Sequence, residues 1–83
     1  MKVMYYIKSP MGSVAVSKSI SKAYKYVKSF CKIIKETEET YDIVDDPNFY
    51  TLAQFKEILK NERKVSYEQT NNNYWVIEEL PLI

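Results

Sequence analysis

Residues 18–36 read KSISKAYKYVKSFCKIIKE, and this stretch has the clearest periodicity in the chain. At about 100° per residue, its lysines fall on one side of a helix and its apolar residues on the other. The apolar stripe consists of Ile20, Ala23, Val27, Phe30, Cys31 and Ile34. The pattern predicts an amphipathic helix over residues 18–36, with Ser17 or Ser19 as its N-cap.

The residues before this helix predict a strand and a turn. Residues 2–8 alternate between apolar and more polar side chains, which is the period of a half-buried strand. Residues 9–12 then form a turn, because Pro10 presets a turn dihedral and Gly12 accepts a positive φ. Residues 14–16 predict a short returning strand. The alternative is that they lead directly into the helix.

A second helix is predicted downstream of an acidic segment. Residues 41–44 favour a brief strand, although the surrounding acids weaken that pattern. Thr51 and Gln54 have the spacing of a capping box, and an apolar stripe follows that ends near Asn61. The sequence therefore predicts a helix from Thr51 to about Asn61.

The C-terminal part predicts a hairpin. Residues 65–68 and 74–77 read as two strands, and Asn71 to Asn73 form the turn because asparagine tolerates the left-handed region. Together the elements predict one α+β domain over residues 1–83, an antiparallel sheet of three to five strands with two helices packed on it. The expected core contains Val3, Tyr5, Ile7, Ile20, Val27, Phe30, Ile34, Leu52, Phe55, Leu59, Val65, Tyr67 and Val76.

The charge of the chain is divided between two parts. Residues 1–35 contain eight lysines and no acid, so they carry +8. Residues 36–83 contain four bases and eleven acids, so they carry −7, and the two parts add to the net charge of +1. Asymmetry of this kind indicates binding by electrostatic complementarity.

The residue types argue against catalysis. The chain has no histidine and one cysteine, so a Cys–His dyad and a Cys/His zinc site are impossible within it. A phosphate-cradling loop needs several glycines, and Gly12 is alone. Cys31 lies in the apolar stripe and is expected to be buried in a reducing cytoplasm. No stretch approaches the roughly 20 apolar residues of a membrane span. We expect a non-enzymatic cytoplasmic protein without metal or cofactor.

The acidic segment is the favoured contact surface for a partner protein. Its carboxylates lie beside aromatic side chains that can act as apolar anchors. A solvated acidic turn is the simplest interpretation; a hard-cation site and an imitation of a phosphate backbone are the alternatives, although the spacing fits no EF-hand loop. The predicted surface consists of Glu38, Glu39, Tyr41, Asp42, Asp45, Asp46, Phe49 and Tyr50.

The lysine side of the first helix is the alternative contact surface. A row of lysines can follow a nucleic-acid backbone, although the helix contains no arginine to read base edges. An acidic membrane surface and plain solvent exposure are the other interpretations. The row consists of Lys18, Lys22, Lys25, Lys28, Lys32 and Lys35.

The composition of the chain looks like that of many small accessory proteins of bacterial viruses and mobile elements. It is short, poor in glycine and rich in lysine, tyrosine and asparagine. This likeness implies a protein that binds and inhibits or modulates a host factor in the host cytoplasm. It assigns no site residue.

Overall fold

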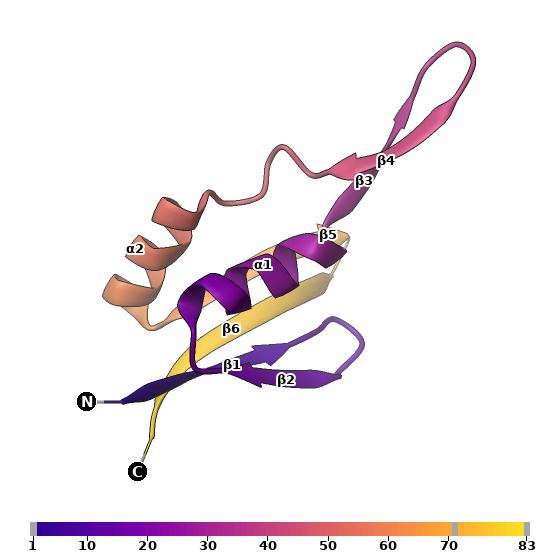
Figure 1. The fold of residues 1–83 in the computed structure, drawn as a ribbon. Coiled ribbons are helices and arrows are strands. Elements are labelled where there is room, and N and C mark those ends of the chain that lie inside the picture. The colour runs from indigo at the N-terminus through magenta and orange to yellow at the C-terminus, as the bar shows by residue number, and fades with distance from the viewer. Residues whose placement is uncertain (1, 71, 83) are drawn as a thin grey trace.

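A computed structural model describes residues 2–70 and 72–82 and has an α+β fold (Figure 1). A four-stranded antiparallel sheet carries two helices, and a separate two-stranded hairpin extends from them. The elements are β1 (Val3–Lys8), β2 (Val14–Ser17), α1 (Ile20–Phe30), β3 (Lys32–Glu36), β4 (Tyr41–Asp45), α2 (Leu52–Glu62), β5 (Lys64–Thr70) and β6 (Asn73–Pro81).

The four-stranded sheet has the order β2-β1-β6-β5. Ile7 in β1 lies opposite Ala15 in β2 and Ile77 in β6, and Ile77 in turn lies opposite Val65 in β5. Because side chains alternate along a strand, this register places Ile7, Ile77 and Val65 on one face of the sheet. Both helices cover that face (Figure 1).

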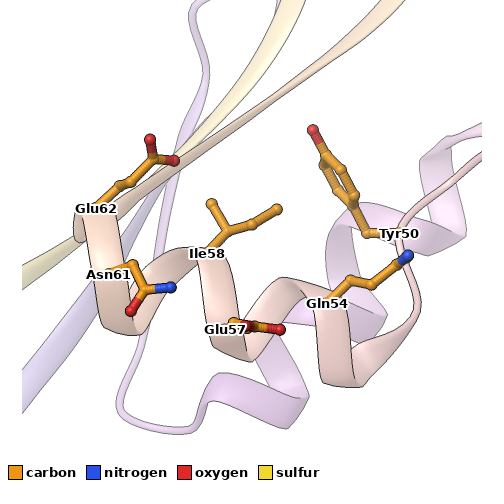
Figure 2. A pocket seen from close by; sticks show the side chains of 6 residues that line it. All are labelled: Tyr50, Gln54, Glu57, Ile58, Asn61 and Glu62. Atoms are coloured by element: carbon orange, nitrogen blue, oxygen red, sulfur yellow. The ribbon is translucent and has the colours of Figure 1, made fainter.

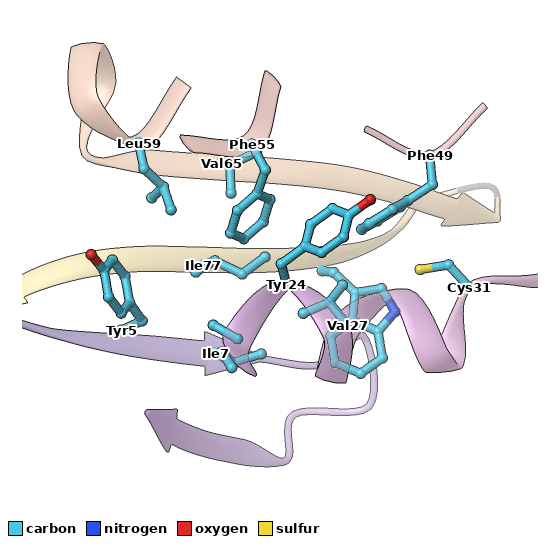
Figure 3. Close-up of a cluster of buried hydrophobic side chains, with 12 residues drawn as sticks. Tyr5, Ile7, Tyr24, Val27, Cys31, Phe49, Phe55, Leu59, Val65 and Ile77 are labelled. Carbon is cyan, nitrogen blue, oxygen red and sulfur yellow. The ribbon is translucent and has the colours of Figure 1, made fainter. Parts of the chain in front are cut away.

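The core lies between the helices and this face of the sheet (Figure 3). The Tyr24 ring packs edge-on against the Phe55 ring, with 5.3 Å between centroids, and joins the two helices. Burial of apolar area of this kind is the main stabilising contribution in a small domain. The buried residues are Tyr5, Ile7, Ala23, Tyr24, Val27, Cys31, Phe49, Phe55, Leu59, Val65, Trp75 and Ile77.

The structure confirms most of the strand, capping and turn signals that the sequence contains. Residues 14–17 form the returning strand β2 rather than a lead-in to the helix. Ser19 is the N-cap of α1, and its hydroxyl accepts a hydrogen bond from the Lys22 N–H. Thr51 and Gln54 form the predicted capping box of α2. Asn72 has a φ of 63° in the β5–β6 turn, whereas Asn71 lies outside the described residues.

The predicted extent of the first helix is wrong at both ends, mainly at its C-terminal end. The helix occupies Ile20–Phe30, and residues 32–36 form β3 instead. Ile33 and Ile34 lie opposite Val44 and Ile43 across the hairpin. Adjacent β-branched residues lose side-chain freedom in a helix and pack well across strands, so pairing prevails although the helical periodicity continues through Ile34.

The predicted core is wrong at three positions, of which Phe30 and Ile34 lie at or beyond the end of α1 and Val76 lies on β6. Phe30 is half exposed at the last turn of α1, and Ile34 is mostly exposed on β3. Val76 is half-buried and points to the sheet face opposite the helices, because its neighbours Trp75 and Ile77 point into the core.

The β3–β4 hairpin extends away from the rest of the molecule (Figure 1). The molecule measures 53 × 26 × 18 Å along its principal axes, an elongated shape to which the hairpin contributes. Its strands pair only with each other among the described strands. An isolated two-stranded hairpin is marginally stable in water, so the exposed hairpin is the least supported element of the fold.

Two phenylalanine substitutions test this description of the core. Phe55→Ala removes a buried ring and should lower the free energy of unfolding by about 3–5 kcal/mol. Phe30→Ala removes a half-exposed ring stacked on Trp75 and should cost only about 1–2 kcal/mol. Urea unfolding followed by circular dichroism measures both. Equal losses for the two variants would contradict the burial difference.

Candidate functional site: the β3–β4 hairpin

Backbone and threonine hydrogen bonds hold the hairpin at both ends. At the tip, the Thr37 N–H donates to the Thr40 carbonyl over 2.9 Å, and the Thr40 N–H donates to the Thr37 hydroxyl over 3.1 Å. At the base, the Asp46 N–H donates to the Cys31 carbonyl over 3.1 Å. These bonds fix the register of β3 against β4.

One face of the hairpin is apolar and exposed. Ile34 and Ile43 lie directly opposite each other, and Tyr41 lies two residues before Ile43 on the same face. The side chains of Ile34, Ile43 and Tyr41 are 67%, 74% and 76% exposed. We call these three residues the apolar hairpin face. Contiguous exposed apolar side chains of this kind are typical of contact surfaces.

Acidic residues surround the apolar hairpin face. Residues 32–45 contain five acids and two lysines, a net charge of −3. The Lys32 ammonium forms an ion pair with the Asp45 carboxylate. The hydrogen bond from Lys32 and its positive charge lower the pKa of Asp45. Glu38 and Glu39 occupy the tip and are exposed. The hairpin therefore combines an apolar surface with a negative rim.

The predicted acidic and aromatic surface is divided between two places in the structure. Glu38, Glu39, Tyr41, Asp42 and Asp45 lie on the hairpin and are exposed. Asp46, Phe49 and Tyr50 belong instead to the connection that packs onto the body of the domain.

Phe49 is a loop anchor packed onto the domain, which is one of its two interpretations from the sequence, and its place in the predicted contact surface is wrong. Its ring is buried against Tyr24 and Tyr67, with centroids 5.6 and 4.8 Å away. The Tyr50 hydroxyl donates to the Ser66 carbonyl over 3.0 Å, so this half-buried residue is also tied to the domain. Both aromatic residues are anchors for their own loop, because a connection leaving an exposed hairpin must be fixed to the core.

Asp46 also has a structural role. Its carboxylate accepts hydrogen bonds from the Tyr67 hydroxyl and from the Asn48 N–H. Burial and the hydrogen bond to Asp46 raise the pKa of Tyr67 above its usual range. The Tyr67 hydroxyl therefore keeps its proton and donates it in the hydrogen bond that ties the Asp46 loop to β5.

The predicted lysine row is interrupted. Lys22, Lys25 and Lys28 lie in α1, and Lys18 precedes the helix. The Lys28 ammonium lies 5.7 Å from the centroid of the Tyr24 ring. Lys32 and Lys35 are on β3 instead, where they lie opposite Asp45 and Asp42. Two of the six lysines are thus positioned beside acids rather than along a helix.

An aromatic groove of about 450 Å³ lies between the C-terminal end of α1 and the β1–β2 turn. The Phe30 ring stacks on the Trp75 ring with 5.4 Å between centroids, and Tyr26 packs edge-on against Phe30. The Trp75 indole N–H donates to the Gln69 side chain over 3.0 Å. The groove carries less charge than the hairpin, because no residue that lines it is ionised. The lining consists of Ser9, Pro10, Met11, Ser13, Tyr26, Phe30, Gln69, Asn73 and Trp75.

A second groove, of about 360 Å³, runs along α2 (Figure 2). Gln54 in its lining is already engaged in the capping box, and the Tyr50 hydroxyl is bonded to Ser66. The carboxylates of Glu57 and Glu62 do not converge on a common point (Figure 2). Paired carboxylates need to flank one reacting bond for acid–base chemistry, and this groove does not offer that arrangement.

Within residues 2–70 and 72–82, no three acidic or cysteine side chains come together in a group that could hold a metal ion. Neither helix in that part of the chain is long and apolar enough to cross a membrane. Cys31 is buried, as the sequence predicts, and burial followed by the nearby Asp46 charge raises the pKa of its thiol to about 11.

Sequence reasoning missed Ile34 and Ile43 as contact candidates. It assigned Ile34 to the buried stripe of a helix, and the acids around Ile43 obscured the strand. Two adjacent β-branched residues, Ile33 and Ile34, directly after a helix are the signal that could have found the hairpin. No protein-family model, curated protein or solved structure matches the chain. The geometry and the sequence therefore carry the functional argument.

Labelling of Cys31 tests the base of the hairpin. At pH 8 an aromatic disulfide reagent should modify the folded protein at least about a hundredfold more slowly than the urea-unfolded chain, because the thiol is buried and its pKa is raised. The thiolate becomes abundant only as the pH approaches about 11. The absorbance of the released thiol measures both rates. Similar rates in the two states would place Cys31 at the surface.

Proposed function

We propose that this chain is a small non-enzymatic binding protein that contacts another protein through the β3–β4 hairpin. The contact would inhibit or modulate that protein, in keeping with the viral or mobile-element character of the composition. The proposal uses the part of the predicted acidic surface that is exposed. It does not use Asp46, Phe49 or Tyr50, which are engaged within the domain.

The observation that carries the proposal is the exposure of the apolar hairpin face. Ile34, Tyr41 and Ile43 each leave two thirds or more of their surface in water, on an element that is marginally stable alone. A partner that covers this face removes apolar area from water and adds packing to the hairpin. Tyrosine is also enriched among the residues that contribute most binding energy at protein interfaces.

The charges around the apolar hairpin face indicate a basic partner. Glu38 and Glu39 at the tip have no described ion pair, whereas Asp45 on the same face as Tyr41 and Ile43 is paired with Lys32. Asp42 lies on the other face of the hairpin, opposite Lys35. Rim charges mainly steer association and select partners, and apolar anchors supply most of the affinity. We therefore infer a partner with a positively charged surface around an apolar depression that accepts Tyr41.

Nucleic-acid binding through α1 is the second candidate. Lys22 and Lys25 are exposed on α1, and Tyr26, which lines the aromatic groove, is 43% exposed. An exposed aromatic ring beside lysines suits single-stranded nucleic acid, on which bases stack. The placement of Lys32 and Lys35 beside acids shortens the positive row, so this function ranks below protein binding.

A pair of double variants separates the two surfaces. Tyr41→Ser with Ile43→Ser should reduce capture of a partner from host lysate at least about tenfold, because the apolar anchors are lost. Lys22→Glu with Lys25→Glu on α1 is the matched control and should leave capture unchanged. Quantitative mass spectrometry of the captured proteins gives the ratios. Both variants should retain the parent's circular dichroism spectrum. Loss of capture in the lysine variant alone would move the contact to α1 and contradict the hairpin proposal.

Salt dependence tests the nucleic-acid candidate directly. We expect no gel shift of short duplex or single-stranded DNA or of RNA at low salt. A nucleic-acid contact would instead produce a shift that weakens with a log–log slope of about −0.9 for each duplex phosphate neutralised. A shift that disappears in the Lys22→Glu, Lys25→Glu variant would favour the second candidate over the first.

A further inference from the structure

The outer edge of β3 presents backbone groups that no described strand uses. The bonded pairs at the two ends of the hairpin are Thr37 with Thr40 and Cys31 with Asp46. Hydrogen-bonded pairs alternate along an antiparallel ladder, so Ile33 and Lys35 also bond toward β4. The intervening residues Lys32, Ile34 and Glu36 therefore direct their N–H and carbonyl groups toward the free edge.

The order of side chains along this edge is self-complementary. An antiparallel copy of β3 centred on Ile34 places Ile34 opposite itself and Lys32 opposite Glu36 at both ends. All three positions have outward backbone groups, so each can form a hydrogen-bonded pair. We propose that β3 pairs in this register with β3 of a second copy of this chain, which makes a symmetric dimer. This proposal goes beyond the proposed function and is independent of it.

Other registers of the same edge are less favourable. A shift of two residues in one direction places Lys32 opposite Ile34 and removes both ion pairs. A shift in the other direction places Lys35 opposite Lys35 of the second copy. Like charges directly opposite each other are destabilising, and opposite charges contribute favourably. The register centred on Ile34 also uses the full length of the strand.

The other strand edges are poorer partners for a second copy. On β4 the corresponding symmetric register is centred on Ile43 and places Tyr41 opposite Asp45, with no opposite charges. On β5 the Ser66 carbonyl already accepts the Tyr50 hydroxyl. β2 has only four residues. Among these edges, only β3 combines outward backbone groups with a charge order that places opposite charges face to face in a symmetric pair.

The dimer would also supply what the hairpin lacks. The two hairpins become one four-stranded sheet with the order β4-β3-β3-β4, and three or more strands with an apolar face reach independent stability. On one face, Ile43 and Ile34 of each copy form a continuous row. Tyr41 stays on the outer strand of each copy, so the apolar hairpin face doubles and remains available to another protein.

Charge exchange between two variants tests the register. Glu36→Lys should raise the dimer dissociation constant at least about tenfold, because Lys32 then faces a lysine. Lys32→Glu with Asp45→Lys should do the same, since the introduced glutamate faces Glu36, while the ion pair within the hairpin is kept in reversed form. An equimolar mixture of the two variants restores opposite charges at both ends and should form a heterodimer. Sedimentation velocity over a concentration series measures the dissociation constant of each variant and of the mixture.

Proline substitutions provide a matched control for the edge. Ile34 and Ile43 are opposite each other, and both direct their N–H groups outward, so proline at either position spares the bonds between β3 and β4. Ile34→Pro should abolish the dimer, whereas Ile43→Pro should retain it. A parent that stays monomeric up to millimolar concentration, or a dimer lost only in Ile43→Pro, overturns the proposal.

The dimer and the proposed function have distinguishable outcomes. A monomeric parent that still captures a host protein through Tyr41 and Ile43 would reject the dimer and keep the hairpin as the contact. A parent that dimerises through β3 but captures no host protein would keep the dimer and reject the hairpin as the contact with a partner protein.

Discussion

Tyr24 is the residue on which the arrangement of this small domain depends. The centroid of its ring lies 5.3 Å from that of the Phe55 ring and 5.6 Å from that of the Phe49 ring. Its hydroxyl donates a hydrogen bond to the Tyr50 carbonyl over 2.7 Å. One side chain of α1 thereby holds both α2 and the connection that leads into it. Because that connection packs onto the body of the domain, residues 32–45 leave the body and return to it at defined places, although β3 and β4 pair only with each other among the described strands.

This arrangement explains why the proposed contact surface and the core share few residues. The aromatic residues that the sequence offers as binding anchors, Phe49 and Tyr50, hold the base of the projection. The exposed anchors are Ile34, Tyr41 and Ile43, which have no neighbours to cover them on a two-stranded hairpin. A surface that is costly to expose is stabilised when a partner covers it, so binding and hairpin stability are coupled in the proposed function.

The fold also pairs part of the charge that the sequence separates. Along the sequence, lysines precede acids at about residue 36. In the fold, the hairpin brings the end of the basic part beside the start of the acidic part, so Lys32 meets Asp45 and Lys35 lies opposite Asp42. The excess charge that remains is negative at the hairpin and positive on α1. These two surfaces are the ones that the competing functional proposals use.

The sequence by itself determined the α+β class, the C-terminal hairpin, the capping box of α2 and the burial of Cys31, because each depends on a local pattern of alternation, capping or turn residues. For residues 14–16 it left two alternatives, and the structure shows the returning strand β2. The composition alone also shows that a Cys–His dyad cannot form within the chain, which has no histidine. Only the tertiary structure decided that α1 ends at Phe30, that Ile34 is exposed and that Phe49 is buried. The residues around Ile34 continue the helical period, whereas the β-branched pair Ile33 and Ile34 favours a strand. The choice depends on cross-strand partners beyond the tip of the hairpin, which no local pattern contains.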